Sequence, residues 1–294
     1  MISKLKNWYE HKYKLLMLIP FLLVVLALIQ IGVQYAVTGD FVHKGITLKG
    51  GSTITITPQT QISPVELETF LKQKFPSADI SVRTISVAGK VVSMAIDSDT
   101  QSNEDIGALV TAIKEKMPLR AQDYSVEVVG SALGASFFKQ TALALLASFA
   151  LMGVVVILYF RVWVPSLAVI LAAFSDITVT LAIFNLTGIK LSTAGIAAFL
   201  MLIGYSVDTD VLLTTRLLKR DDGTVMERIY GAIKTGMTMT TTTIVAVLVA
   251  FFLVQSEVVK QIMTILLIGL FIDMLMTWIQ NVGILRLYLE RKKI

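Results

Sequence analysis

The sequence predicts an α-helical polytopic membrane protein with six spans and an extracytoplasmic α+β domain of the ferredoxin-like type. Composition is the first observation: 55% of the 294 residues are hydrophobic, 16% are charged and the mean hydropathy is +0.74. These values exclude an ordinary soluble domain. The second observation is that the apolar residues gather in six long runs. The third is a stretch of about a hundred residues between the first two runs, where charges are balanced and short patterned segments replace the apolar run.

The rare residue types limit the chemistry that we expect. The chain has no cysteine, and its two histidines, His11 and His43, lie outside the apolar runs. Disulfides, thiol chemistry, cofactors and a metal site built on Cys or His are therefore not expected. The net charge of +5 comes from basic residues at the ends of apolar runs, which indicates topology signals and not a nucleic-acid surface. No nucleophile–base pair or phosphate loop is found, so we expect no enzyme.

The first span follows a short basic segment. Residues 1–14 are polar and predict a cytoplasmic N-terminus, and residues 15–37 form a charge-free run. About 20 residues suffice to cross the hydrocarbon core. The run is longer than the apolar core of a typical signal peptide, and no small-x-small cleavage site follows it. We therefore expect a retained anchor.

Residues 38–138 predict the folded outer domain. Strands are expected where β-branched residues alternate with others, and helices where Ser-Pro or Ser-x-x-Asp precedes an apolar face of helical spacing. The turn at Gly89 predicts a hairpin between two of the strands. The expected order is strand, helix, two strands, helix and strand, over residues 45–57, 63–75, 80–96, 102–117 and 124–129. This order is that of the split βαβ sandwich found in ferredoxin-like domains.

Residues 139–285 predict five further spans. These are residues 140–160, 164–186, 191–213, 236–254 and 261–285. The charged loop before the fifth span contains residues 224–233, whose pattern predicts a short interfacial helix, and residues 286–294 form a basic cytoplasmic tail. If the N-terminus is cytoplasmic, the basic residues near the membrane gather on the cytoplasmic side, as the positive-inside rule requires. We therefore expect a multi-pass protein of the cell membrane with both termini in the cytoplasm.

Acids inside the apolar runs are the candidate functional residues, because an aspartate at the centre of a spanning helix costs roughly 2.5–3.5 kcal/mol. Asp176 shares a helix face with Ala172 and Thr180, and a stripe of small and polar residues usually faces other helices. Removal from water favours the neutral form of a carboxyl group, which suits reversible protonation in an ion path. The alternative is a structural hydrogen bond to a neighbouring helix, and we favour the ion path.

Two acids follow in the next span, and a cation lies near its end. Asp208 and Asp210 point about 160° apart on a helix, so they cannot both face one path. For Asp208, which shares a face with Gly204, a functional role and a place near the interface stay open. For Asp210 we favour a place near the interface. Arg216 is most simply a topology anchor; the functional alternative is a counter-charge to Asp176 or Asp208.

The last span carries Asp273 within a polar stripe that is too long to face lipid. The stripe consists of Gly269, Asp273, Thr277, Gln280 and Asn281. It can act as helix–helix glue or as part of a relay, and both readings stay open. The threonines at positions 238 and 240–243 are a weaker signal. Their hydroxyls can bond to the backbone of their own helix, and we expect most of the run to serve helix packing, with some members facing water.

Several motifs resemble those of one family, the SecD/SecF protein-export membrane proteins, whose SecF members have one span, an outer domain and five spans. Residues 45–51, Gly-Ile-Thr-Leu-Lys-Gly-Gly, resemble the family's Gly-Ile-Asp-Phe-x-Gly-Gly. Residues 204–211, Gly-Tyr-Ser-Val-Asp-Thr-Asp-Val, resemble Gly-Tyr-Ser-Ile-Asn-Asp-Thr-Val, and Asp176 and Arg216 match the family's spanning Asp and its Asp-Arg arginine. The motif residues are Gly45, Gly50, Gly51, Gly204, Tyr205 and Ser206. Gly50-Gly51 also predicts a bend or bulge in its own right. Ser175 replaces a bacterial His, and the pattern is closer to the archaeal branch.

The resemblance implies a protein that resembles half of a resistance-nodulation-division transporter. It implies SecD as partner, assistance to the SecY/SecE translocon, and an outer domain that handles the translocating polypeptide. A proton gradient would act through Asp176, with Arg216 tuning it. Membrane lipid is the other expected partner. The residues alone leave open a self-sufficient secondary transporter of a small or lipid-like solute, acting as a homodimer, and a scaffold without ion flux.

Overall fold

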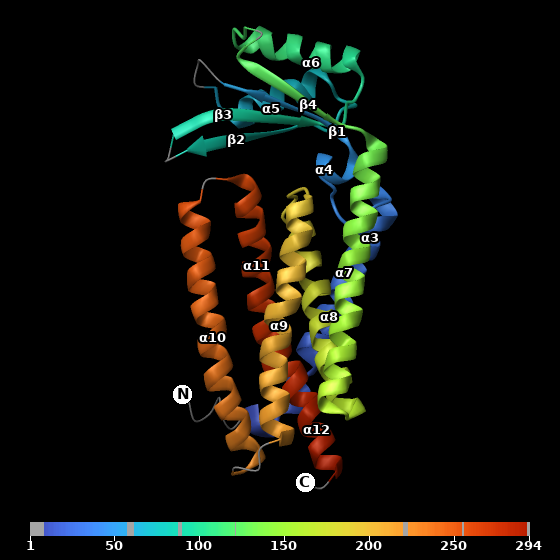
Figure 1. Ribbon diagram of the computed structural model, residues 1–294, viewed down its shortest axis with the longest axis vertical. Helices are drawn as coiled ribbons and strands as arrows, with labels where there is room; N and C mark the ends of the chain where they lie inside the picture. Colours follow the sequence, from blue (N-terminus) through green and yellow to red (C-terminus); the bar gives the residue numbers. More distant parts are fainter. Residues whose placement is uncertain are drawn as a thin grey trace.

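The computed structural model in Figure 1 has a small α/β domain at one end of a bundle of long helices. The structure describes residues 9–57, 62–87, 90–120, 122–219, 223–254 and 256–292. Both chain ends lie towards the end of the bundle that is farther from the sheet (Figure 1). The molecule therefore has two structural regions, the α/β domain and the helix bundle.

Six helical segments of the described chain are long and apolar enough to cross a membrane, which confirms the six predicted spans. The first is α2 and α3 (Tyr13–Leu16 and Leu18–Thr38). The next four are α7 (Ser131–Phe160), α8 (Trp163–Leu186), α9 (Thr193–Lys219) and α10 (Val225–Leu253). The last is α11 (Glu257–Leu275), the π-helix η1 (Met276–Asn281) and α12 (Val282–Lys292).

Three helix limits differ from the sequence predictions. Helix α7 begins at Ser131 and not at residue 140. The predicted interfacial helix at residues 224–233 is the first part of α10, which starts at a capping box between Thr224 and Glu227 and has no break after it. The predicted tail is helical as far as Lys292, because Leu285 and Leu289 of α12 are buried in the bundle.

The α/β domain has the ferredoxin-like topology that its segment order predicts. Its elements are β1 (Gly51–Ile56), α5 (Pro64–Lys74), β2 (Ser81–Val87), β3 (Lys90–Ser98), α6 (Asn103–Lys116) and β4 (Tyr124–Val129). The sheet order is β2-β3-β1-β4, and all neighbouring strands are antiparallel. Apolar side chains of the sheet pack with α5 and α6 around Ile54, Leu71 and Leu109. The predicted turn residue Gly89 lies outside the described residues.

The predicted strand at residues 45–57 is wrong in its first half. Residues Ile46–Lys49 form the short helix α4, and the strand starts only at Gly51. The chain changes direction at Gly50 and Gly51, whose φ angles of 89° and 145° disfavour other residues. A Cβ atom on Gly50 would lie 2.6 Å from the Cα atom of Ser131, at the start of α7. The predicted bend is therefore confirmed, and it is also where the α/β domain meets the bundle.

Candidate functional site

Polar side chains gather in the interior of the bundle where α8, α9 and the last span pack together. Each of them is less than 5% exposed. We call this set the acid cluster: Ser175, Asp176, Thr180, Ser206, Thr209, Asp210, Thr214, Asp273, Thr277, Gln280 and Asn281. Polar atoms buried at this depth require hydrogen-bond partners or a changeable charge, so the cluster is the first candidate for function.

Asp176 lies at the α8 side of the acid cluster. Its Oδ2 atom accepts a hydrogen bond from the Ser206 hydroxyl of α9 at 2.5 Å, and its Oδ1 atom has no donor among the described residues. Ala172 and Thr180 are also completely buried, which confirms that the predicted stripe faces other helices. One carboxylate oxygen of Asp176 thus remains available to a proton or a cation.

Among the described residues, Asp273 accepts hydrogen bonds from hydroxyl groups only. Thr209 of α9 donates to the carboxylate at 3.2 and 3.3 Å, and Thr277, one turn further along the last span, donates at 3.1 Å. The Thr209 hydroxyl has a single proton and also lies 2.8 Å from the backbone oxygen of Ser206, so this proton is shared between Asp273 and the residue that donates to Asp176. Short polar side chains of α9 therefore link the surroundings of Asp176 with those of Asp273.

Asp210 belongs to the acid cluster, and Asp208 does not. Asp210 is completely buried and accepts a hydrogen bond from Asn281 Nδ2 at 2.7 Å. The prediction that Asp210 lies near the interface is therefore wrong. Asp208 is exposed on the opposite side of α9, because two residues turn a helix by about 200°. Ser206 and Thr214, four residues before and after Asp210, mark its polar helix face.

The π-helix η1 positions the amides of the acid cluster. It replaces α-helical geometry over Met276–Asn281, in a span whose sequence predicted an uninterrupted α-helix. Gln280 Nε2 donates to Ser175 Oγ of α8 at 3.1 Å, while the adjacent Asn281 bonds to Asp210 of α9. Adjacent side chains thus reach two different helices. π-Helical turns are frequent at functional sites.

No positive charge neutralises the acid cluster in the described part of the chain. None of the ion pairs there includes Asp176, Asp210 or Asp273. Arg216 instead extends to α10, where its Nη2 atom donates to Thr235 Oγ1 at 2.8 Å. The alternative interpretation of Arg216, as a counter-charge to Asp176 or Asp208, is therefore not supported by an ion pair in the described part of the chain. Three buried carboxylates without a cation are too costly to ionise together, so the cluster suits the uptake and release of a cation.

The motif residues lie in three places. Gly45 donates its backbone N–H to the Leu191 oxygen at 2.8 Å and, like Gly50 and Gly51, belongs to the junction with the α/β domain. Ser206 is a member of the acid cluster. The remaining motif residues, Gly204 and Tyr205, lie on the outer face of α9, a stripe of exposed side chains formed by Ala197, Met201, Gly204, Tyr205 and Asp208.

The weaker sequence signals also have clear places. Thr238 and Thr242 donate to backbone oxygens of their own helix at 2.8 and 2.7 Å, as predicted for the threonine run. The functional neighbours missed by sequence reasoning are Thr209 and Asp210. The signal that identifies them is the spacing of Ser206, Asp210 and Thr214 on one helix face.

Among the described residues, no group of three or more His, Cys, Asp or Glu side chains is arranged to hold a metal ion.

Comparison with known proteins gives consistent matches. The family model described as "Protein export membrane protein SecD/SecF, C-terminal" matches residues 109–291. The protein-export membrane protein SecF of Pyrococcus furiosus is 39% identical over 292 residues, covering 99% of this chain and 96% of its own. SecF of Methanothermobacter thermautotrophicus is 39% identical over 283 residues, covering 95% of this chain and 93% of its own. These two relatives come from archaea, in agreement with the archaeal character of the motifs.

The fold is similar to a solved structure. The crystal structure of SecDF from Thermus thermophilus, described as a translocon-associated membrane protein, matches with a TM-score of 0.73 at 20% identity. The match covers 96% of this chain but only 38% of the solved chain. A second SecDF structure, in a super-membrane-facing form, matches with a TM-score of 0.57 at 17% identity. The whole described arrangement of spans and α/β domain thus has a counterpart within a longer protein.

Proposed function

The chain belongs to the SecD/SecF family of protein-export membrane proteins, and from this premise we propose that it assists Sec-dependent export as the SecF-type half of a SecD–SecF pair. In this role a cation, a proton in the first instance, moves through the acid cluster. That movement is coupled to displacement of the α/β domain, which handles the polypeptide leaving the SecY/SecE translocon. The proposed role is one of transport assistance and not of enzymatic catalysis.

The observation that best supports ion coupling is the set of buried carboxylates without a cationic partner among the described residues. Asp176 and Asp210 each keep one oxygen with no hydrogen-bond donor among the described residues. The donors around Asp176, Asp210 and Asp273 are neutral hydroxyls and amides, so a proton can be gained or lost without breaking an ion pair. In a membrane, acids facing a bundle interior mark ion and proton pathways. Asp208 and Arg216 lie outside this hydrogen-bonded set.

The outer face of α9 supports pairing with a second membrane protein. Asp208 is exposed there beside Gly204, within a helix whose other side is packed in the bundle. A carboxylate facing lipid is costly, whereas small residues allow another helix to approach closely. The structural relative is a single SecDF chain of which this chain covers 38%, which leaves room for a SecD part. SecD is therefore the partner that we propose for this face.

We also propose that both termini lie in the cytoplasm. The ends of α7, α9 and α12 lie at the end of the bundle opposite the α/β domain (Figure 1). These helix ends carry Arg161, Lys219, Arg286 and Lys292, and the positive-inside rule assigns such an end to the cytoplasm. The α/β domain would then be extracytoplasmic. Because the chain has no cysteine, single-cysteine variants at Ser102 and Arg291 can test this assignment with a membrane-impermeant maleimide. Labelling of the Ser102 variant in intact cells, and of the Arg291 variant only after lysis, is the expected result.

The pairing is tested by gentle solubilisation of native membranes and purification of the chain through a C-terminal tag. A stoichiometric SecD-type partner, together with translocon subunits, is the expected result. Recovery of a homodimer alone would contradict the pairing and favour the alternative of a self-sufficient solute transporter. Solute flux would then be the next assay.

The ion-coupling role is tested by Asp176→Asn in membrane vesicles that translocate a secretory substrate. The variant should lose the gradient-dependent part of translocation, because an amide side chain, unlike a carboxylate, cannot take up and release a proton at the pH of the assay. Assembly with the partner should be unchanged, which copurification measures. Full gradient-dependent stimulation in the variant would remove Asp176 from the proposed mechanism.

A further inference from the structure

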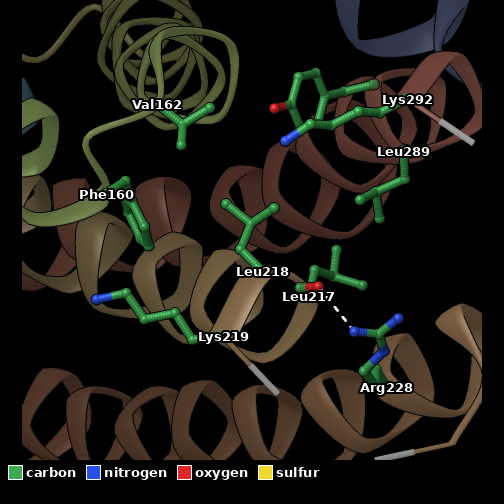
Figure 2. A pocket seen from close by; sticks show the side chains of 9 residues that line it. Phe160, Val162, Leu217, Leu218, Lys219, Arg228, Leu289 and Lys292 are labelled. Atoms are coloured by element: carbon green, nitrogen blue, oxygen red, sulfur yellow. Dashed lines mark hydrogen bonds between the residues drawn. The ribbon is translucent and has the colours of Figure 1, made fainter. Parts of the chain in front are cut away.

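The ends of α7, α9 and α12 lie at the end of the helix bundle opposite the α/β domain (Figure 1). Residues at these helix ends line a pocket (Figure 2). Its volume is about 190 Å³, well above the roughly 10–15 Å³ that one water molecule requires. Four helical elements contribute to it: the ends of α7, α9 and α12 and the start of α10. We call it the basic pocket, and its lining residues are Phe160, Val162, Leu217, Leu218, Lys219, Arg228, Tyr288, Leu289 and Lys292.

The basic pocket combines an apolar floor with a cationic rim. Leu217, Leu289 and Phe160 are buried and supply the floor, whereas Lys219 and Lys292 are exposed. Figure 2 shows Lys292 and Lys219 on different sides of the side chains of Leu218 and Phe160. None of the nine lining residues is acidic. The pocket therefore favours an anionic group with an apolar part attached to it.

Contacts within the protein engage all three cations of the basic pocket, and Lys292 Nζ lies 5.8 Å from the centroid of the Tyr288 ring. The Lys219 ammonium lies 3.6 Å from the centroid of the Tyr159 ring, a cation–π distance that restricts the side chain. Arg228 donates from Nη1 to the Leu217 backbone oxygen at 3.0 Å, as the dashed line in Figure 2 marks. The rim charges are thus partly fixed in place, which lowers the entropy cost of binding an anion.

Exposed aromatic residues place the basic pocket at the depth of the lipid headgroups. Trp163 and Tyr159, which flank the α7–α8 turn beside the pocket, are 70% and 47% exposed. Trp and Tyr gather at the membrane–water interface, and basic pockets between spanning helices bind lipid headgroups there. Leu158 and Leu167 continue the same surface as exposed apolar side chains. An acyl chain can lie along them while its headgroup occupies the pocket.

We propose that the basic pocket binds the phosphate group of an anionic membrane phospholipid, attracted by the positive charges of Lys219, Arg228 and Lys292 on different sides of the pocket. A free phosphate ion would use the same cations but would leave the apolar floor without a ligand. Nucleic acid is disfavoured because the cations surround a small pocket and do not form an extended stripe. The proposal concerns a site separate from the acid cluster and does not depend on ion coupling.

The test uses the full chain in detergent micelles and native mass spectrometry to measure bound lipid. Phosphatidylglycerol is compared with phosphatidylcholine, which has the same phosphate but no net charge. We expect preferential retention of phosphatidylglycerol. In the double variant Lys219→Gln, Lys292→Gln, the apparent Kd for phosphatidylglycerol should increase by about 30-fold. Each lysine near the membrane surface contributes roughly fivefold to this binding. Arg228 stays unchanged because it also bonds to Leu217.

The matched control removes two cations from the same end of the bundle. Lys12→Gln with Arg291→Gln changes exposed residues that do not line the pocket, and it should leave the apparent Kd within about twofold. Equal weakening by both double variants would show a general charge effect and overturn the site. In a further arm, inorganic phosphate is added at the lipid concentration. Displacement of phosphatidylglycerol by phosphate would assign the pocket to the free ion and overturn the lipid.

A last comparison tests whether the basic pocket binds a lipid or a protein partner. The chain purified with its partner should retain the same preference for phosphatidylglycerol as the chain alone. Loss of that preference in the pair, with the double variant also unable to hold the partner, would assign the basic pocket to a protein contact and contradict the proposal.

Discussion

Acidic side chains in the α/β domain and in the helix bundle have opposite surroundings. In the domain, Asp97 accepts from Arg83 Nε at 2.8 Å, and the Lys74 ammonium lies 2.6 Å from Glu115. In the bundle, Asp176 and Asp273 accept only from hydroxyl groups and face no cation among the described residues. The domain acids are compensated and near water. Asp176 and Asp273 are neither compensated nor near water, so the free-energy cost of their negative charge depends on whether a cation is bound.

This difference separates structural charge from functional charge. A paired surface acid contributes about 0–1 kcal/mol to stability, and its replacement changes little else. A buried acid surrounded by neutral donors destabilises the fold when ionised, and a protein retains such a group for its chemistry. Neutralising substitutions should therefore affect transport in the bundle and only stability in the domain.

The largest expected effect distinguishes the two acids on α9. Asp210→Asn should reduce the gradient-dependent part of translocation at least about tenfold, which corresponds to roughly 1.4 kcal/mol. Asp208→Asn is the matched control, since it makes the same chemical change on the outer face of the same helix. The gradient-dependent part of translocation with Asp208→Asn should stay within about twofold of that with the unmodified chain in the vesicle assay. Equal losses in both variants would contradict the assignment of the ion path to one helix face.

The next effect concerns the junction between the two regions. A Cβ atom on Gly134 of α7 would lie 2.5 Å from the backbone nitrogen of Gly50. Gly134→Ala should therefore cost about 1–3 kcal/mol, through overpacking against a backbone that has no room to move. Thermal unfolding in detergent, with limited proteolysis of the α/β domain, measures this loss.

Gly107→Ala should change the stability in the opposite direction in the same experiment. A Cβ atom at Gly107 of α6 has no neighbour within 4 Å, and alanine is the better helix former. The variant should be stabilised by roughly 0.5–1 kcal/mol. Destabilisation by Gly107→Ala to the same degree as by Gly134→Ala would mean that added side-chain bulk, and not the junction, is the cause.

A smaller effect concerns the amide donors of the acid cluster. Asn281→Leu removes the hydrogen bond that Asp210 accepts at 2.7 Å, so about 1–2 kcal/mol of stability should be lost. Combining it with Asp210→Leu removes the buried acid as well and should recover most of this loss. Denaturation midpoints of the three variants give the coupling between the two residues. Strictly additive losses would exclude a direct interaction.

The smallest effect is expected in the domain. Arg83→Gln removes the partner of Asp97 at the surface of the sheet, where both side chains keep contact with water. The loss of stability should stay below about 1 kcal/mol and should shrink at high salt. Translocation should be unchanged. A larger loss, insensitive to salt, would show that domain acids are not the simple surface pairs described above.

The sequence was sufficient to predict the six spans and the ferredoxin-like domain, because apolar run length and segment order are local signals. The helical start of residues 45–57 was not predictable in this way. It depends on the close approach of α7 to Gly50, a contact between distant parts of the chain. The continuous helix α10 was likewise missed, because a charged segment and an apolar segment share one helix.

The candidate site was predicted in part. Asp176 and Asp273 were recognisable as acids within apolar runs, and both lie in the acid cluster. The prediction for Asp210 is wrong, because nearness to the end of a span indicates the interface, whereas the helix face shared with Ser206 and Thr214 points into the bundle. The π-helix had no recognisable signal in the sequence. The π-helix packs against α8 and α9, contacts between distant parts of the chain that the local pattern does not contain.

The most direct test of ion coupling measures ion flux itself. The chain and its copurified partner are reconstituted in vesicles, and uptake after an imposed proton or sodium gradient is followed with pH- and sodium-sensitive dyes. We expect gradient-driven uptake with the unmodified chain and with Asp208→Asn, and none with Asp176→Asn. Equal uptake with Asp176→Asn, or no uptake by the unmodified pair, would contradict an ion path through the acid cluster.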